Sequence, residues 1–143
     1  NNTLGAISAC RSAGINFADI KNHLRVLKSP GRRFEFKGIW KGRQIVDDYA
    51  HHPSEIRETI SMARLIIESK DSILPNRCDR LIGIFQPHRY SRTRDLMNDF
   101  AESLGKVDLL FLAPIYSAGE SPINEINIKK LKSFILEKRI KIF

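Results

Sequence analysis

The apolar residues of this chain change their spacing repeatedly, from the pattern of a strand to that of a helix and back. Three short apolar runs have the length of buried strands: 44–48, 80–85 and 107–113. Three segments with apolar residues three or four positions apart predict helices: 56–67, 97–104 and 128–135. Strands that alternate with helices at this spacing predict the α/β class, with a mostly parallel sheet and helices on both faces.

The first 30 residues have a different pattern, in which the predicted elements are all helical. Residues 3–14 are rich in small side chains and end at Gly14, which predicts a closely packed helix with a glycine stop. Ile20, Leu24 and Leu27 follow at helical spacing and predict a second, short helix.

The run Ser29-Pro30-Gly31 ends any helix, and we expect a domain boundary there, with residues 1–30 before it and 31–143 after it. Aromatic residues and glycines over residues 34–46 predict a β-hairpin directly after the boundary. The sequence begins without Met and ends within an apolar run, so we expect it to be part of a longer protein, truncated in its last domain.

The charge of the chain is basic, with 24 Lys and Arg against 16 Asp and Glu, a formal net charge of +8. These basic residues are dispersed and no ladder of aromatic residues accompanies them, so we do not expect nucleic-acid binding. No apolar run approaches the roughly 20 residues of a membrane span. The two cysteines, Cys10 and Cys78, lack metal or redox spacing and fit a reducing cytoplasm.

The first candidate site is the histidine loop, residues 47–53, with the sequence Asp-Asp-Tyr-Ala-His-His-Pro. Its acids and histidines follow a predicted strand, where ligands bind in open α/β sheets. They could bind a divalent cation or orient a nucleotide ribose. Alternatively, Asp47 or Asp48 caps the helix that begins at Pro53, and the histidines are half-exposed loop residues. A zinc site is not expected, because no cysteine or further histidine lies nearby in the sequence.

The second candidate site is the arginine segment, residues 85–95, with the sequence Phe-Gln-Pro-His-Arg-Tyr-Ser-Arg-Thr-Arg-Asp. It places three arginines and a histidine at the start of a helix, where positive charge is unfavourable unless an anion is bound. Arginine also suits carboxylates and phosphates. The segment therefore favours an anion site. The alternative is that the arginines are surface residues paired with Asp95 or Asp99.

Several nucleotide and hydrolase motifs are missing from the chain. It contains no G-x-x-x-x-G-K-[ST] phosphate loop, no G-x-G-x-x-G after a strand and no G-x-S-x-G elbow. The chain alone is therefore not expected to be a nucleotide hydrolase or a dehydrogenase.

Four runs, taken in order, resemble the C-terminal part of the Mur ligases of bacterial peptidoglycan synthesis: Arg32-Arg33-Phe34-Glu35, residues 47–53, residues 85–94, and Tyr116-Ser117-Ala118-Gly119-Glu120. The resemblance extends over nearly the whole chain. It is greatest for the branch that joins L-alanine to UDP-N-acetylmuramate. The long run at residues 85–94 is the most specific part of this resemblance.

The resemblance implies an ATP-dependent acid–amino-acid ligase that acts through an acyl phosphate in the bacterial cytoplasm. Residues 1–30 would be the end of the central ATP-binding domain, and residues 31–143 the Rossmann-like C-terminal domain. The implied cofactors are ATP and Mg²⁺, held mainly by an upstream domain. The implied partners are small molecules, without nucleic acid or membrane. The chain by itself is expected to be inactive, because it lacks the phosphate loop.

The resemblance also implies roles for individual residues. Four would frame the amino-acid pocket: Tyr49, His51, Arg89 and Arg92. Of these, His51 would also be catalytic. Three would contact the nucleotide: Asn2, Arg33 and Asp48. No protein ligand to a metal and no role for the segment 123–126 is implied.

Two alternatives stay open. Ala50 stands where the family usually has Gly, and this form of the histidine loop also occurs in the related ligase that reattaches murein tripeptide during recycling. The arginine segment favours the L-alanine branch, because the recycling enzyme lacks it. The other alternative is a non-catalytic α/β module that takes a phosphate or a nucleic acid at the arginine segment.

Overall fold

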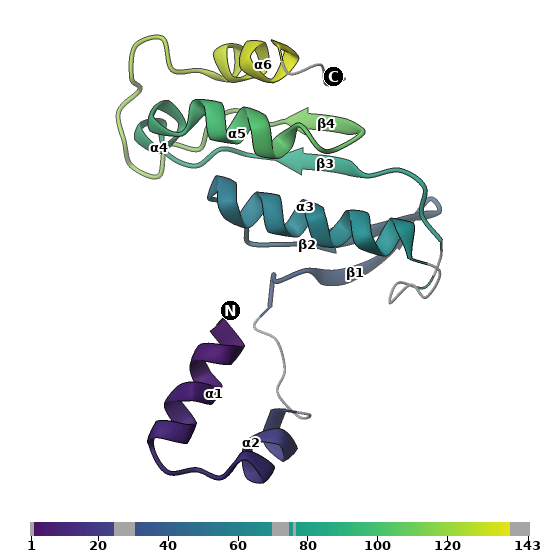
Figure 1. Ribbon diagram of the computed structural model, residues 1–143. Helices are drawn as coiled ribbons and strands as arrows, with labels where there is room; N and C mark the ends of the chain where they lie inside the picture. The colour runs from purple at the N-terminus through teal and green to yellow at the C-terminus, as the bar shows by residue number, and fades with distance from the viewer. Residues whose placement is uncertain (1, 25–30, 70–74, 76, 138–143) are drawn as a thin grey trace. The chain divides into compact units, whose positions relative to one another are not determined.

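A computed structural model describes residues 2–24, 31–69, 75 and 77–137 (Figure 1). The chain divides into two compact units, Asn1–Gly31 and Arg32–Phe143, and each is described by itself. The predicted residues Leu27, Ser29 and Pro30 and the end of the chain after Glu137 lie outside the described residues.

The first unit contains the two predicted helices, α1 (Asn2–Ser12) and α2 (Phe17–Leu24). Gly14 has a φ of +85°, which glycine adopts without strain, and this residue ends the first helical segment as predicted. The side chain of Asn16 accepts a hydrogen bond from the backbone N–H of Asp19 (2.9 Å) and so caps α2. Ile20 on α2 is buried.

The second unit begins with the predicted hairpin, β1 (Glu35–Trp40) and β2 (Arg43–Asp47), which pair antiparallel. Lys41 and Gly42 form the turn, with φ values of +46° and +76°. Positive φ at both turn residues matches the twist of a two-residue hairpin.

The remaining elements are α3 (Pro53–Glu68), β3 (Ile82–Phe85), α4 (Tyr90–Asp95), α5 (Met97–Leu104), β4 (Leu109–Leu112) and α6 (Ile128–Glu137). Apart from the short α4, which is not predicted as a separate helix, strands and helices alternate as the sequence predicts. β3 and β4 pair in parallel, with Ile82 opposite Leu109. The α/β class is thus confirmed. The sheet is less continuous than predicted, because the described residues form two separate pairs of strands rather than one mostly parallel sheet. Residues just before β3 approach β2 through side chains, as in the 2.9 Å contact between Gln44 Nε2 and Cys78 Sγ.

The hydrophobic core lies between one face of the parallel strands and the helices α3, α5 and α6. α5 packs between α3 and α6 (Figure 1). The largest completely buried side chains of the core include Phe100, Leu110, Leu131 and Ile135. Gly83 packs closely here, because a Cβ atom at this position would lie 3.2 Å from Leu110 Cδ1 and the neighbouring side chains would have to shift.

The opposite face of β3 and β4 is exposed among the described residues. Ile82, Ile84 and Phe111 alternate with the core residues along the strands, and Ile84 is 82% exposed. The described helices therefore cover one face of this strand pair, where the sequence predicts helices on both.

α3, the longest described helix, has 16 residues. Among the described residues, no helix is both long and apolar enough to cross a membrane.

Candidate functional site

The arginine segment and the loop after β4 lie side by side, because they continue two parallel strands beyond the same edge. His88 and Tyr116 form a parallel bridge past the ends of β3 and β4. Their rings are also in contact, with centroids 5.1 Å apart. We call residues 116–120 the return loop. The return loop and the arginine segment thus meet at the carboxyl ends of two parallel strands, where ligands bind in open α/β sheets.

The histidine loop faces the same region. The pKa of His88 is lowered, first by partial burial and then by the positive charges of His51, Arg92 and Arg32. Residues from both predicted sites therefore act on one imidazole. The charge of His51 in the histidine loop thus acts on the arginine segment at His88.

The backbone of Arg89 is held in an unusual conformation at the start of α4. Its φ is +71°, a value that costs a non-glycine residue of order 1–3 kcal/mol. The N–H of Arg89 donates to the carbonyl of Tyr116 (2.8 Å). Its own carbonyl accepts hydrogen bonds from the N–H (3.1 Å) and the hydroxyl (2.8 Å) of the buried Thr93. Such strain is typical of functional sites.

The three arginines of the segment have different surroundings. Arg94 forms an ion pair with Asp95 at 2.7 Å, as the surface alternative predicts. Among the described residues, the guanidinium groups of Arg89 and Arg92 have no hydrogen-bond or ion-pair partner, and Arg92 is half-buried. Arg89 and Arg92 are therefore available for an external anion.

The start of α4 is occupied by a carboxylate of the chain itself. Glu120 in the return loop accepts hydrogen bonds from the hydroxyl of Ser91 (2.6 Å) and from its N–H (3.0 Å). These bonds, hydroxyl first, lower the pKa of Glu120, and the charge of Arg89 adds to the effect. The sequence interpretation missed this role, although Glu120 stood in one of the recognised runs. The carboxylate of Glu120 thus supplies negative charge at this helix start, so the positive charge of the helix start does not by itself require a bound ligand.

Asp48 is a structural centre of the histidine loop. Its Oδ1 accepts hydrogen bonds from the N–H of Ala50 (2.7 Å) and the hydroxyl of Thr59 (3.1 Å). Its Oδ2 accepts one from the N–H of Phe34 (2.8 Å). This carboxylate joins the hairpin, the loop and α3. Each carboxylate oxygen can accept about two hydrogen bonds, so Oδ2 has capacity for one more donor.

The cap of α3 is His52, so the alternative in which Asp47 or Asp48 caps this helix is wrong. The Nδ1 atom of His52 accepts a hydrogen bond from the N–H of Ser54 (3.3 Å). The carboxylate of Glu55 accepts one from the N–H of His52 (3.2 Å), which completes a capping box. Pro53 occupies the first helical position, as predicted.

Tyr49 and His51 are held together at the rim of the site. The N–H of Tyr49 donates to the carbonyl of Arg32 (2.6 Å), and the guanidinium of Arg32 lies 5.2 Å from the centre of the Tyr49 ring. The His51 ring meets the Tyr49 ring edge-on at 5.2 Å. His51 Nδ1 lies 3.0 Å from the carbonyl of Tyr49, which can only accept, so Nδ1 carries the hydrogen. In the neutral form of this tautomer, the Nε2 atom of His51 has the free lone pair and can accept a proton.

The other residues predicted to contact a nucleotide have fewer contacts. Arg33 is exposed, and its side chain has no hydrogen-bond partner among the described residues. Asn2 is the first residue of α1 in the other unit, and its side chain lies outside the described part of the chain. The roles of both residues remain predictions.

The described residues contain no group of three or more His, Cys, Asp and Glu side chains that could hold a metal ion. Mg²⁺ binds through carboxylates, waters and substrate phosphates. The described part of the chain therefore does not itself fit a dedicated magnesium cage.

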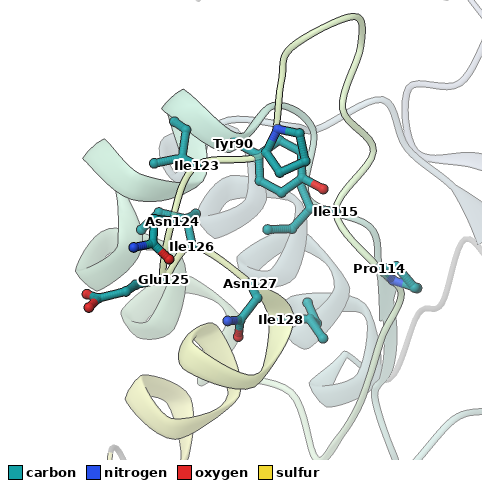
Figure 2. Close-up of a pocket in the computed structure, with 10 residues that line it drawn as sticks. Tyr90, Pro114, Ile115, Ile123, Asn124, Glu125, Ile126, Asn127 and Ile128 are labelled. Carbon is teal, nitrogen blue, oxygen red and sulfur yellow. The ribbon is translucent and has the colours of Figure 1, made fainter.

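An open pocket of about 570 Å³ lies next to the arginine segment, which contributes Tyr90 to its lining (Figure 2). Its lining is largely apolar and comprises Tyr90, Pro114, Ile115, Pro122, Ile123, Asn124, Glu125, Ile126, Asn127 and Ile128. The segment 123–126, to which the sequence assigns no role, forms one wall. None of the residues predicted for the site lines this pocket.

Comparison with known proteins gives one family and a consistent set of relatives. Residues 32–141 match the family model described as "Mur ligase, glutamate ligase domain". The chain is 71% identical over 136 residues to the UDP-N-acetylmuramate–L-alanine ligase of Prochlorococcus marinus strain SARG, covering 95% of this chain and 29% of that protein. It is 53% identical over 135 residues to the enzyme of the same name from strain MIT 9313, covering 94% and 28%.

A solved structure shares the fold. The UDP-N-acetylmuramate-alanine ligase of Thermotoga maritima superimposes with a TM-score of 0.70 at 24% identity, over 99% of this chain and 27% of that one. The chain thus spans less than a third of the length of the relatives that it matches.

Proposed function

Because this chain belongs to the Mur ligase family through residues 32–141, we propose that it supplies the amino-acid-binding part of an ATP-dependent ligase. The ligase joins the amine of L-alanine to the carboxylate of UDP-N-acetylmuramate in peptidoglycan synthesis. The observation that carries the proposal is that the guanidinium groups of Arg89 and Arg92 have no hydrogen-bond or ion-pair partner among the described residues. Relatives that match the chain over nearly its whole length have this activity in their names.

The positive region suits an amino acid. A guanidinium offers parallel N–H donors to a carboxylate, and Arg89 and Arg92 would hold the alanine carboxylate in this way. An amine attacks only in its neutral form, so a proton must leave the alanine ammonium. His51, with Nε2 as acceptor, would take that proton and fill the predicted catalytic role. The amine then attacks the acyl phosphate, the amide bond forms and phosphate leaves.

The nucleotide would be contacted from the histidine-loop side. The remaining acceptor capacity of Asp48 Oδ2 fits a ribose hydroxyl, and the unpartnered Arg33 fits a phosphate. Asn2 would lie on the adenine side. ATP supplies the phosphoryl group that activates the carboxylate, and Mg²⁺ would be held mainly by an upstream domain. The reaction would take place in the bacterial cytoplasm.

The test uses a chimeric ligase, in which this chain replaces the matching segment of the 71% identical Prochlorococcus relative. Arg89→Lys and Arg92→Lys keep the charge but lose the two-pronged geometry. Each should lower kcat/KM for L-alanine by about ten- to a hundredfold, which corresponds to a lost charge-assisted contact. The KM for ATP should change much less.

Arg94→Lys is the matched control, because Arg94 lies on the same helix but pairs with Asp95. If both test variants keep alanine kinetics at the level of this control, the pocket assignment is wrong. The same assay with murein tripeptide in place of L-alanine distinguishes the recycling activity from the L-alanine ligase activity. A chimera that uses only the tripeptide would replace the L-alanine assignment.

A further inference from the structure

We propose that Glu120 is a positioning residue, which holds the start of α4 so that Arg89 and Arg92 point at the anionic substrate. The inference rests on the proposed function for the identity of the anion. The fixing of the start of α4 by Glu120 rests on contacts within the chain. Glu120 has no other assigned role.

The first argument is the geometry of the bond between Glu120 and Ser91. Oε1 accepts the Ser91 hydroxyl and Oε2 accepts the Ser91 N–H, at 2.6 and 3.0 Å. A carboxylate with both oxygens engaged by one residue is fixed in orientation as well as in distance. Ser91 stands between Arg89 and Arg92 in the sequence, so this bond fixes the backbone that carries both guanidinium groups.

The second argument is that the return loop holds the arginine segment at two points. Besides the contact of Glu120, the carbonyl of Tyr116 accepts the N–H of Arg89, and the N–H of Tyr116 donates to the carbonyl of Pro87, both at 2.8 Å. Between these points the loop turns sharply, with φ values of +51° at Ala118 and +88° at Gly119. The turn returns the chain so that Glu120 reaches α4.

The third argument is electrostatic. α4 has only six residues, and its N-cap, Arg89, makes no side-chain capping bond. The N–H groups of the helix start and the nearby arginines all carry positive charge, which favours opening of this turn. Glu120 supplies the compensating negative charge without forming an ion pair with either guanidinium in the described structure. Both guanidinium groups therefore stay available for substrate.

The kinetic test compares Glu120→Gln and Glu120→Ala in the chimeric ligase. The glutamine keeps one acceptor oxygen but loses the charge, so we expect the KM for L-alanine to rise about fivefold with Glu120→Gln, less than for a fully lost charge-assisted hydrogen bond, and to rise further with Glu120→Ala. The KM for ATP should stay within about twofold, since the nucleotide residues lie in other segments. Glu125→Gln is the control, because Glu125 is exposed and pairs only with Lys130 in the described structure, at 3.6 Å.

A second measurement does not depend on catalysis. Amide hydrogen exchange in the chain itself should be about tenfold faster at Arg89 and Ser91 in Glu120→Gln than in the unchanged chain, because the turn opens more often. Exchange at Phe100 in α5 should stay the same. Unchanged exchange at Arg89 and Ser91 would overturn the positioning role. If exchange accelerates while Arg89→Lys leaves alanine kinetics intact, Glu120 holds the turn and it is the proposed function that fails.

Discussion

The guanidinium of Arg64 on α3 and the carboxylate of Asp108 before β4 form a two-pronged ion pair, with N–O distances of 2.7 and 3.0 Å. The same carboxylate accepts the N–H of Leu81 just before β3 (2.6 Å). Arg64 also donates to the carbonyl of Lys106 from two nitrogens. One ion pair therefore joins α3 to the entrances of both parallel strands. It helps to set the position of the helix that follows the histidine loop relative to the strand that precedes the arginine segment.

Asp108→Asn should therefore destabilise the second unit. Charged hydrogen bonds contribute about 1.5–3 kcal/mol, and we expect the lower part of that range because the Asp108 side chain is 34% exposed. Urea unfolding followed by circular dichroism measures the change. Glu102→Gln on α5 is the control, since it also removes an exposed carboxylate. Equal stability of the two variants would show that the ion pair contributes nothing measurable.

The lowered pKa of His88 predicts a dependence of stability on pH near neutrality. Burial, and then the neighbouring positive charges, disfavour the protonated imidazole in the folded state. The unfolded chain therefore binds a proton first, and the free energy of unfolding should fall as the pH drops below about 6.5, the ordinary value. His88→Gln should remove this part of the pH dependence. Unfolding in urea at pH 7.5, 6.5 and 5.5 tests it, and identical slopes for both proteins would contradict it.

A second loss of stability should occur at more acidic pH. The pKa of Glu120 is lowered by its hydrogen bonds from Ser91, that of Glu55 by the N–H of His51, and that of Asp108 by Arg64. Each contribution is complete above the ordinary values of 4.5 for Glu and 3.8 for Asp, and is lost as the pH falls through the lowered values. Between pH 5 and 3, Glu120→Gln should show a shallower decline than the unchanged chain.

The local patterns of the sequence predict most elements because their causes are local. Spacing alone places α3, α5 and α6, and the glycine at position 42 places the hairpin turn. α4 is missed as a separate helix because Tyr90–Asp95 is almost entirely polar and has no apolar period. Its start depends on Glu120, 29 positions further along the chain. No short-range signal carries such a contact.

The candidate site is also predicted only where its causes are local in the sequence. Both loops follow predicted strands, and that is enough to select them. The effect of His51 on His88 joins segments that are far apart in the chain, and periodicity does not encode such a relation. The cap of α3 is likewise misjudged, because acids are the commoner caps, whereas here Asp48 binds three donors elsewhere and His52 takes the capping position.

Asp48 itself gives a prediction that separates a structural role from nucleotide binding. Because its carboxylate joins the hairpin, the loop and α3, Asp48→Asn should lower the melting temperature whether or not it meets a ribose. Thr59→Val removes one of these hydrogen bonds and leaves the carboxylate in place.

In the chimeric ligase, Thr59→Val should lower the melting temperature and leave the KM for ATP unchanged. Asp48→Asn should lower the melting temperature and also weaken the binding of ATP by about 1.5–3 kcal/mol, the range for a charged hydrogen bond. The kinetics with L-alanine should be nearly unaffected. Steady-state kinetics that vary each substrate in turn, together with thermal unfolding of the same samples, measure both effects. If Asp48→Asn changes only the melting temperature, the carboxylate is purely structural, and the nucleotide contact on this side falls to Arg33.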